Sequence, residues 1–560
     1  MRLRTAGAIA LLVASTLSAS TLVGCHSFGR IFNSVPTYYD LGGIHRTVST
    51  DSAEAQLWFD RGLGLTFGFN HEEAIRCFDR AIEADPTCAM AYWGKAYALG
   101  PNYNNPVMTE ETSRLAHEAT QKALAITNIT PVERALIEAL DARYPYAELS
   151  DRVTLEKNFA SAMEEVHAKF PDDADIAAFT AEALLQLRPW KLWSPDGKAA
   201  PETPRIRAVL EPALERWPNH PALCHLYIHT MEASPEVEKA LPYARNLSKR
   251  NSGLGHLIHM PSHIYIWTGN YADSLEANTA AVAVDDIYAD FAGRENFYTL
   301  YRVHNYHFIA YSAMFTGEKE IALEAARAIP REIPDALHAS AGDFTDIFVA
   351  TPYHVMVRFG MWEELVTEPQ PPENLPAARA VWSYSQGVAY AALGRMTEAV
   401  VAQSEFRNRA AEVPATRYLF QNPVSEVLKV ADAVLEGEIE YRRGNYDRAF
   451  ATLRRAVELD RGLNYDEPWG WMEPAAHALG ALLTEQGRFE EALPVYEANL
   501  KRFPENGWAL FGMAECLHGM GRHEEAKAME GRFADAWRRA TVKIPGSCFC
   551  KGVKEPLAAR

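Results

Sequence analysis

The chain has 560 residues, of which 48% are hydrophobic and 23% are charged, a composition that excludes an intrinsically disordered protein. Its length exceeds a usual single core and therefore allows several packed units or one elongated array. The formal net charge of −18 argues against a nucleic-acid partner, because phosphate binding needs a clustered excess of Lys and Arg.

Residues 1–24 are predicted to be an export signal, because two arginines precede an apolar run that is too short to span a bilayer. Residues 22–25, Leu-Val-Gly-Cys, resemble the bacterial lipobox, which implies lipidation of Cys25 and attachment to a membrane. His26 stands where inner-membrane lipoproteins carry Asp, so the resemblance favours the outer membrane, on its periplasmic or surface side. The alternative is an ordinary secretory signal with a chance cysteine. Residues 25–50, which follow the signal, are predicted to be a tether.

Helical repeats are predicted to begin at residue 51. In the first helical pair, a large residue, small residues, an aromatic residue and a proline stand at a characteristic spacing. These six residues are Trp58, Gly62, Ala74, Phe78, Ala81 and Pro86. This spacing resembles the tetratricopeptide repeat, a helix-turn-helix unit of about 34 residues. Near the C-terminus the same positions are filled by Gly480, Ala492, Tyr496 and Pro504, whereas Asn499 departs from the pattern.

Between these ends, a glycine recurs between helical patterns, where it can end a helix without a steric penalty. The turn glycines are Gly269, Gly317, Gly360, Gly394, Gly444, Gly487 and Gly521. The resemblance implies an all-α fold, an α-solenoid of tetratricopeptide repeats in a right-handed superhelix. Bends are expected near 290–302 or 414–429, where the spacing slips.

The repeat register divides the mature chain into four predicted parts. Residues 51–220 are N-terminal repeats and repeat-like helices with insertions, residues 221–345 a His-rich central block, residues 346–540 C-terminal repeats, and residues 541–560 a Cys-containing tail.

Histidines are concentrated in the central block: seven of the 18 lie between residues 225 and 307, about a seventh of the chain. At about 100° per residue, the offsets within each segment place these side chains on one helix face. In the tetratricopeptide register they occupy positions that face the concave groove. The main candidates are His225, His229, Glu232, His256, His259, His263, His304 and His307, and the additional ones are Glu182 and His354.

Imidazole and carboxylate groups that converge from successive helices provide the lone pairs that a transition metal requires. The candidates therefore predict a site for one or two ions, with copper or zinc favoured and iron left open. The alternative is a polar groove that binds a peptide.

No catalytic residue follows from the sequence, because Leu226 stands where a zinc protease of the H-E-x-x-H type has its general base. The central block also resembles exported bacterial tetratricopeptide proteins of unassigned activity. Three hypotheses remain open. They are a metal-dependent hydrolase or oxidoreductase acting on a small molecule or peptide, an adaptor that binds proteins in the cell envelope, and a metal store or delivery protein. In the last, Cys548 and Cys550 would be a hand-off pair.

Overall fold

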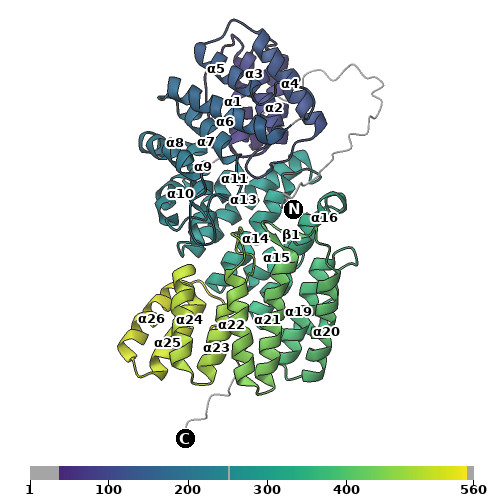
Figure 1. Cartoon of the computed structure of the whole chain (residues 1–560), viewed down its shortest axis with the longest axis vertical. Coiled ribbons are helices and arrows are strands. Elements are labelled where there is room, and N and C mark those ends of the chain that lie inside the picture. The colour runs from purple at the N-terminus through teal and green to yellow at the C-terminus, as the bar shows by residue number, and fades with distance from the viewer. Residues whose placement is uncertain (1–36, 150, 250–252, 552–560) are drawn as a thin grey trace, which may run out of the picture. The chain divides into compact units, whose positions relative to one another are not determined.

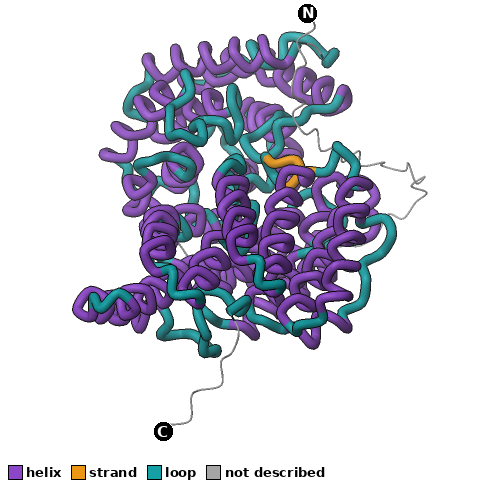
Figure 2. The backbone as a smooth tube through the Cα atoms, turned by 60° about the horizontal axis from the view of Figure 1, so that its bottom comes forward, coloured by secondary structure: helices purple, strands orange, loops and turns teal. Residues whose placement is uncertain are grey.

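The protein is seen in a computed structural model that describes residues 37–149, 151–249 and 253–551. The predicted export signal and Cys25 lie outside these residues. The predicted all-α class is confirmed, since helices dominate and one short strand pair occurs in the described residues (Figure 2). None of the described helices combines the length and apolar character needed to cross a membrane.

The chain divides into two compact units (Figure 1). Of the described residues, the first unit contains those up to residue 261 and residues 280–298, and the second contains residues 262–279 and 299–551. In the first unit lie η1 (Thr37–Tyr39), α1 (Ala53–Phe67), α2 (His71–Ala84), α3 (Ala89–Leu99), α4 (Glu110–Ala125), α5 (Pro131–Asp141), α6 (Arg152–Lys169), α7 (Ala174–Leu185), α8 (Thr203–Arg216), α9 (Pro221–Met231), η2 (Val237–Ala240), α10 (Leu241–Ser248) and α11 (Gly255–His259).

Residues of α12 (Pro261–Tyr265) and α13 (Tyr271–Ala292) are assigned to both units. The second unit also contains α14 (Thr299–Thr316), α15 (Lys319–Glu332), α16 (Asp335–Phe348), α17 (Thr351–Arg358), α18 (Trp362–Thr367), α19 (Pro376–Ala392), α20 (Met396–Glu412), β1 (Tyr418–Leu419), β2 (Asn422–Pro423), α21 (Val424–Arg442), α22 (Tyr446–Arg461), α23 (Ala475–Glu485), α24 (Phe489–Arg502), α25 (Gly507–Gly519) and α26 (His523–Ala536).

The turn glycines adopt the backbone conformation that their predicted role requires. All seven have φ between +63° and +80°, in the left-handed region that favours glycine. Each follows the helix whose end it was predicted to mark, and successive helices such as α21 and α22 then pack side by side. The sequence spacing therefore located the helix hairpins correctly.

Close packing of an aromatic ring between two glycines recurs in both units. A Cβ atom at Gly62 or Gly94 would lie 2.6 or 2.4 Å from the ring of Phe78. In the second unit a Cβ atom at Gly480 or Gly512 would lie 2.5 or 2.4 Å from the ring of Tyr496. These glycines allow adjacent helices to close around a buried ring, which explains the small and aromatic positions in the repeat pattern.

Replacing Gly512 with alanine is expected to destabilise the protein by about 1–3 kcal/mol, although alanine has the higher helix propensity, because the buried ring of Tyr496 leaves no room for a methyl group. Gly531 is a matched control in the same unit, since nothing lies within 4 Å of a Cβ atom built there. Gly531→Ala should stabilise by up to about 1 kcal/mol. Urea denaturation of both variants measures the difference, and equal stabilities would contradict this packing.

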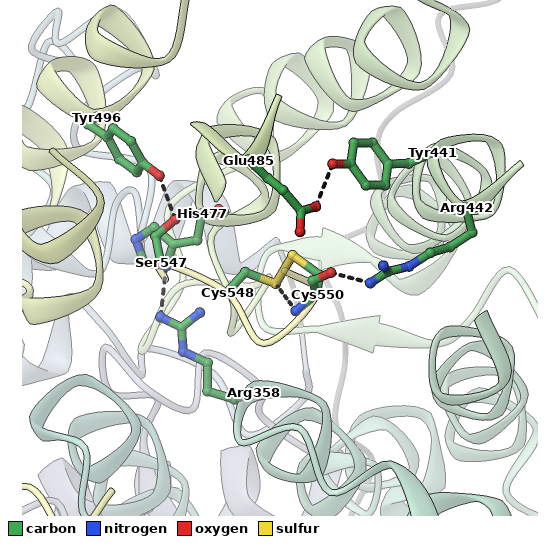
Figure 3. Close-up of a disulfide and its surroundings, with 9 residues drawn as sticks. All are labelled: Arg358, Tyr441, Arg442, His477, Glu485, Tyr496, Ser547, Cys548 and Cys550. Atoms are coloured by element: carbon green, nitrogen blue, oxygen red, sulfur yellow. Dashed lines mark hydrogen bonds between the residues drawn. A yellow bond between two sulfur atoms is a disulfide. The ribbon is translucent and has the colours of Figure 1, made fainter. Parts of the chain in front are cut away.

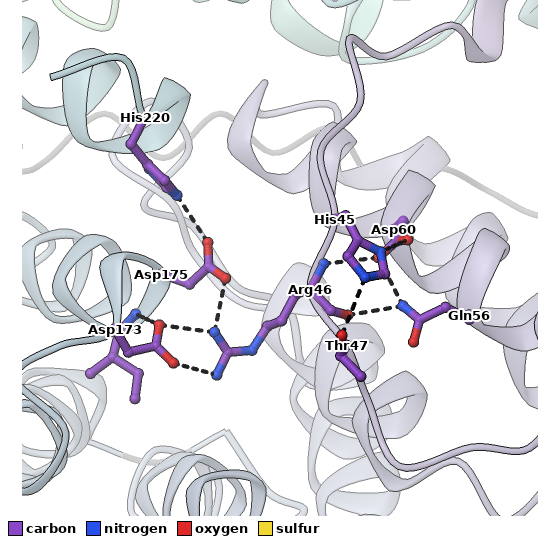
Figure 4. A network of polar contacts seen from close by, with 9 residues as sticks. His45, Arg46, Thr47, Gln56, Asp60, Asp173, Asp175 and His220 are labelled. Atoms are coloured by element: carbon purple, nitrogen blue, oxygen red, sulfur yellow. Dashed lines mark hydrogen bonds and ion pairs between the residues drawn. The ribbon is translucent and has the colours of Figure 1, made fainter. Parts of the chain in front are cut away.

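An arginine fastens the N-terminal segment to the first unit (Figure 4). The guanidinium of Arg46 donates to Asp173 Oδ1 at 2.9 Å and to Asp175 Oδ2 at 2.8 Å, both at the start of α7. His220, which precedes α9, contacts Asp175 Oδ1 at 3.0 Å. Burial alone would raise the pKa of Asp175, but His220 and Arg46 bring it below the usual value, so the carboxylate stays ionised. The same network fixes the start of the helix that carries two candidate ligands.

Candidate metal centre

In the first unit three histidines converge from two helices. His225 and His229 lie one turn apart on α9, and His256 lies in the first turn of α11. Each of the three can offer a ring nitrogen that lies within 4.8 Å of the others, and the Nε2 atoms of His225 and His256 are 3.2 Å apart. The three side chains are at most 2% exposed. They form what we call the three-histidine group.

The backbone of α11 is fixed by two residues outside it. The His256 amide donates to the Tyr298 hydroxyl at 3.1 Å, and that hydroxyl donates to Asp285 Oδ1 at 3.1 Å. A Cβ atom at Gly255 would lie 1.9 Å from Asp285 Oδ1, so only glycine permits this close approach. These contacts hold His256 towards α9.

Hydrogen bonds orient the two histidines of α9. Nδ1 of His225 lies 2.9 Å from the carbonyl oxygen of Phe67, which can only accept, so Nδ1 carries the proton. Nδ1 of His229 likewise lies 3.1 Å from Glu232 Oε1. Both rings are therefore left with a lone pair on Nε2, the arrangement found in histidines that bind metals. Within this unit Glu232 orients His229, a candidate ligand.

Two aromatic side chains enclose the three-histidine group. The Phe69 ring centroid lies 4.5, 6.0 and 5.4 Å from those of His225, His229 and His256. Tyr103 lies 4.5 Å from His229 by the same measure. Phe69 has φ of +54°, a conformation that is costly for a bulky residue. The backbone at Phe69 is therefore strained, and this conformation places the apolar ring of Phe69 against the imidazoles.

Burial keeps the imidazoles of His225 and His229 neutral at physiological pH. It lowers the pKa of His229 to about 3. Burial and then the neighbouring His229 lower the pKa of His225 well below its usual value. A neutral imidazole is the form that binds a metal, so little proton competition is expected near pH 7. His259, also fully buried, stacks near His256 with ring centroids 5.8 Å apart.

The second unit has its own pair of histidines beside a carboxylate. His263 Nδ1 and His304 Nε2 lie 3.7 and 3.9 Å from Glu467 Oε2, and all three side chains are buried. Their surroundings are apolar, since Phe308 stacks on His263 and Phe420 lies edge-on to His304. We call these three residues the His-His-Glu set.

The remaining candidates lie elsewhere in the described part of the chain. Glu182 accepts a hydrogen bond from Tyr97 at 2.7 Å, and burial raises its pKa to about 7. His354 Nδ1 lies 2.8 Å from Glu473. Among the described residues, His307, His354 and Glu182 are in no group of donors within 4.8 Å of one another. Cys548 and Cys550 form a disulfide, so in this state they offer no thiolate pair for the hand-off of a metal.

The pKa of His307 gives a prediction about stability. Burial and then the charge of His354 lower this pKa to about 3, against about 6.5 in the unfolded chain. Between these values the unfolded state binds the extra proton, so His307 favours unfolding as the pH falls below 6.5. From pH 7 to pH 5.5 the wild-type protein should lose about 1 kcal/mol more stability than His307→Leu. Urea denaturation at both pH values checks this, and an equal loss would contradict it.

Sequence reasoning missed three residues that contact the candidate ligands: Phe69, Tyr103 and Glu467. Phe69 follows the first helix of a repeat, Tyr103 lies in the loop after α3, and Glu467 lies in the loop between α22 and α23. None lies near a candidate ligand in sequence, and no spacing relates them to the central block. Only the tertiary structure brings them to the histidines.

Comparison with known families identifies the class of the chain. Two family models, both described as tetratricopeptide repeat, match residues 70–99 and 483–529. The chain is therefore a helical repeat protein that contains tetratricopeptide repeats, as the sequence pattern predicted. No curated protein matches it.

Several solved structures are remotely similar. The human IFIT1 dimer with PPP-AAAA is 12% identical, with 88% of this chain and 92% of that chain covered and a TM-score of 0.33. The APC/C hetero-tetramer Cut9-Hcn1 is 12% identical, with 88% and 79% covered and a TM-score of 0.31. A Rap protein complexed with Competence and Sporulation Factor is 8% identical, with 66% and 99% covered and a TM-score of 0.31. Such low TM-scores carry no inference about function.

Proposed function

We propose that the protein binds a transition metal, zinc or copper, through the three-histidine group of its first unit. The observation that carries this proposal is the approach of ring nitrogens of three buried histidines to within 4.8 Å of one another. Without an ion, His225 and His256 can share a hydrogen bond between their Nε2 atoms, 3.2 Å apart, whereas an ion about 2 Å from each nitrogen would use the lone pairs of all three imidazoles. Three nitrogen ligands suit both metals and leave a fourth position for water or a substrate atom.

The test is metal analysis of the purified full chain before and after reconstitution with zinc or copper. We expect close to one additional ion per chain in the wild type relative to the triple variant His225→Ala, His229→Ala and His256→Ala. A matched control replaces His518 and His523, an exposed pair of imidazoles 3.1 Å apart in the second unit. Metal content unchanged by the triple replacement would refute the three-histidine group.

The His-His-Glu set of the second unit supports a second ion. Its two imidazoles and one carboxylate are ligand types that zinc accepts. His263→Ala with His304→Ala should then remove metal that the first triple variant retains. Retention of the full metal content by this double variant would confine binding to the first unit.

Metal-dependent hydrolysis or oxidation is the catalytic role that such a centre would support. The three-histidine ligand set with an open position is the arrangement of metal ions that activate water. Turnover of a substrate panel by the metal-loaded protein, and its loss in the triple histidine variant, would establish an enzyme. Tight but exchangeable metal without turnover would instead establish a store or delivery protein.

A second candidate function is that of a protein-interaction adaptor, which the tetratricopeptide repeats favour. Proteins of this class commonly bind peptides or proteins through their helix hairpins. Capture of a partner that survives both a chelator and the triple histidine replacement would assign binding to the repeats. Loss of capture in either case would make partner binding a consequence of the metal.

We also propose that the protein is exported and anchored by a lipid on Cys25, in the outer membrane. The support is the sequence of residues 1–25, which combines an export signal with a lipobox-like end. Labelling with a radioactive fatty acid, followed by membrane fractionation, tests this. Cys25→Ser should lose the label and leave the membrane fraction, and a wild-type protein without label would exclude the anchor.

A further inference from the structure

A disulfide near the C-terminus, shown in Figure 3, lies in the second unit, and a buried acid that the figure does not draw lies beside it. Cys548 is bonded to Cys550, which is 1% exposed, while Cys548 is half-buried. Glu438, on α21, can offer a carboxylate oxygen that lies within 4.8 Å of both sulfur atoms. The proposed metal function uses neither the disulfide nor this acid.

The segment that carries the disulfide is built into the repeats. Ser547 Oγ donates to the carbonyl of His477 at 2.8 Å, and the Tyr496 hydroxyl contacts the same Oγ at 2.8 Å. Phe549 packs edge-on against Trp508. These contacts do not involve the sulfur atoms, so breaking the disulfide leaves them in place. Both cysteines would then stay close enough for the bond to form again.

Glu438 has the position expected of a proton donor. Its side chain is 4% exposed, and in the described part of the chain Oε2 has no hydrogen-bond partner. Burial raises its pKa to about 7, an effect opposed by the charge of Arg442 and strengthened by that of Glu473. The acid is therefore partly protonated at neutral pH. The guanidinium of Arg442 also donates to the carbonyl of Cys550, which places a positive charge near a developing thiolate.

We propose that Cys548 and Cys550 form a redox-active pair that exchanges electrons with a dithiol reductant, with Glu438 as the proton donor to Cys550. A thiolate of the reductant attacks the accessible Cys548 sulfur, which forms a mixed disulfide and breaks the Cys548–Cys550 bond. Cys550 leaves as a thiolate and takes the proton of Glu438. The second thiol of the reductant gives its proton to Glu438 and, as a thiolate, displaces Cys548, which takes a proton from water. The reductant ends as a disulfide, and the protein gains two electrons and two protons.

The test follows the thiol state of one tryptic peptide, residues 544–551, which carries both cysteines. The folded full chain is incubated with dithiothreitol at pH 7, quenched with N-ethylmaleimide and digested, and circular dichroism is recorded in parallel. We expect two labels on this peptide while the fold is retained, and their loss after reoxidation. Labelling that requires a denaturant would overturn the proposal.

Replacement of the acid tests its role. Glu438→Gln is expected to slow reduction at least tenfold at pH 7, in keeping with general acid catalysis. The control Glu485→Gln, which keeps an acceptor for the Tyr441 hydroxyl, should reduce at the wild-type rate. Equal rates for wild type and Glu438→Gln would remove Glu438 from the mechanism.

A measurement on the wild type covers the case in which Glu438→Gln does not fold. The reduction rate, divided by the thiolate fraction of dithiothreitol, should fall as the pH rises from 6 to 9, because Glu438 loses its proton. Arg442 and Glu473 are the charged groups that set where this fall occurs. A normalised rate that stays constant over this range would also overturn the role of Glu438.

Discussion

Replacing Glu232 with glutamine is expected to weaken metal binding to the first unit by about ten- to a hundredfold without unfolding it. The carboxylate accepts a hydrogen bond from His229 Nδ1 at 3.1 Å, which fixes the ring and increases the electron density on Nε2. Glutamine has the same shape and can still accept this hydrogen bond, but it has no charge. The affinity should therefore fall while the position of the ring is kept.

Competition with a colorimetric chelator measures this affinity directly and does not depend on any enzymatic activity. Glu236→Gln is the matched control, because Glu236 lies four residues further along and is paired with Arg207 and Lys239 at the surface. Its affinity for metal should equal that of the wild type. An unchanged affinity in Glu232→Gln would show that Glu232 does not act through His229.

The largest effect on stability is expected from Glu156→Ala, which should lower the free energy of unfolding by about 3–5 kcal/mol. Glu156 Oε2 accepts from Arg143 Nε at 3.0 Å, and Arg143 is only 1% exposed. Although burial alone would lower the pKa of Arg143, the charge of Glu156 raises it above its usual value. Without the carboxylate, the buried guanidinium of Arg143 would lose its ion-pair partner and keep only weaker contacts, among them the carbonyl of Pro101, 2.9 Å away, and the rings of Tyr144 and Phe159.

Urea denaturation followed by tryptophan fluorescence measures this loss. Glu118→Ala serves as the control, since its ion pair with Arg114 is about half exposed and should contribute no more than about 0.5 kcal/mol. Replacing both partners, by Arg143→Met and Glu156→Leu, should restore much of the lost stability, because the buried guanidinium is then removed together with its carboxylate. A double variant as unstable as Glu156→Ala would mean that packing rather than charge is responsible.

Local rules were sufficient to predict much of this fold. A glycine after each helix and the small residues around Phe78 and Tyr496 are consequences of short-range geometry, and short-range geometry is visible in a sequence. The convergence of His225, His229 and His256 was also predictable, because the predicted repeat register gives each of them a groove position. Repeats convert sequence spacing into spatial proximity.

Contacts that depend on loops were not predictable in the same way. Glu467 approaches His263 and His304 from a loop that no repeat register describes. Phe69 reaches the imidazoles because a single residue has a left-handed backbone conformation, which no helical pattern encodes. The pairing of Cys548 with Cys550 was likewise open, since two nearby cysteines fit either a metal or a disulfide. One boundary between the two compact units, at residues 298 and 299, falls within 290–302, where the repeat spacing slips, whereas the boundaries near residues 261 and 279 have no counterpart in that spacing.

The ion pairs of Arg46 hold the N-terminal segment on the first unit. If a lipid on Cys25 anchors the protein, they limit the distance between the first unit and the bilayer. Tyr38 is already buried in the first unit, and Arg46 secures the same stretch of chain to Asp173 and Asp175. If Cys25 carries the lipid, about 12 residues separate it from Thr37, and even a fully stretched chain of that length reaches only about 40 Å. With a lipid on Cys25, the start of the first unit would therefore lie within about 40 Å of the membrane surface, which would restrict where a reactant or partner could reach it.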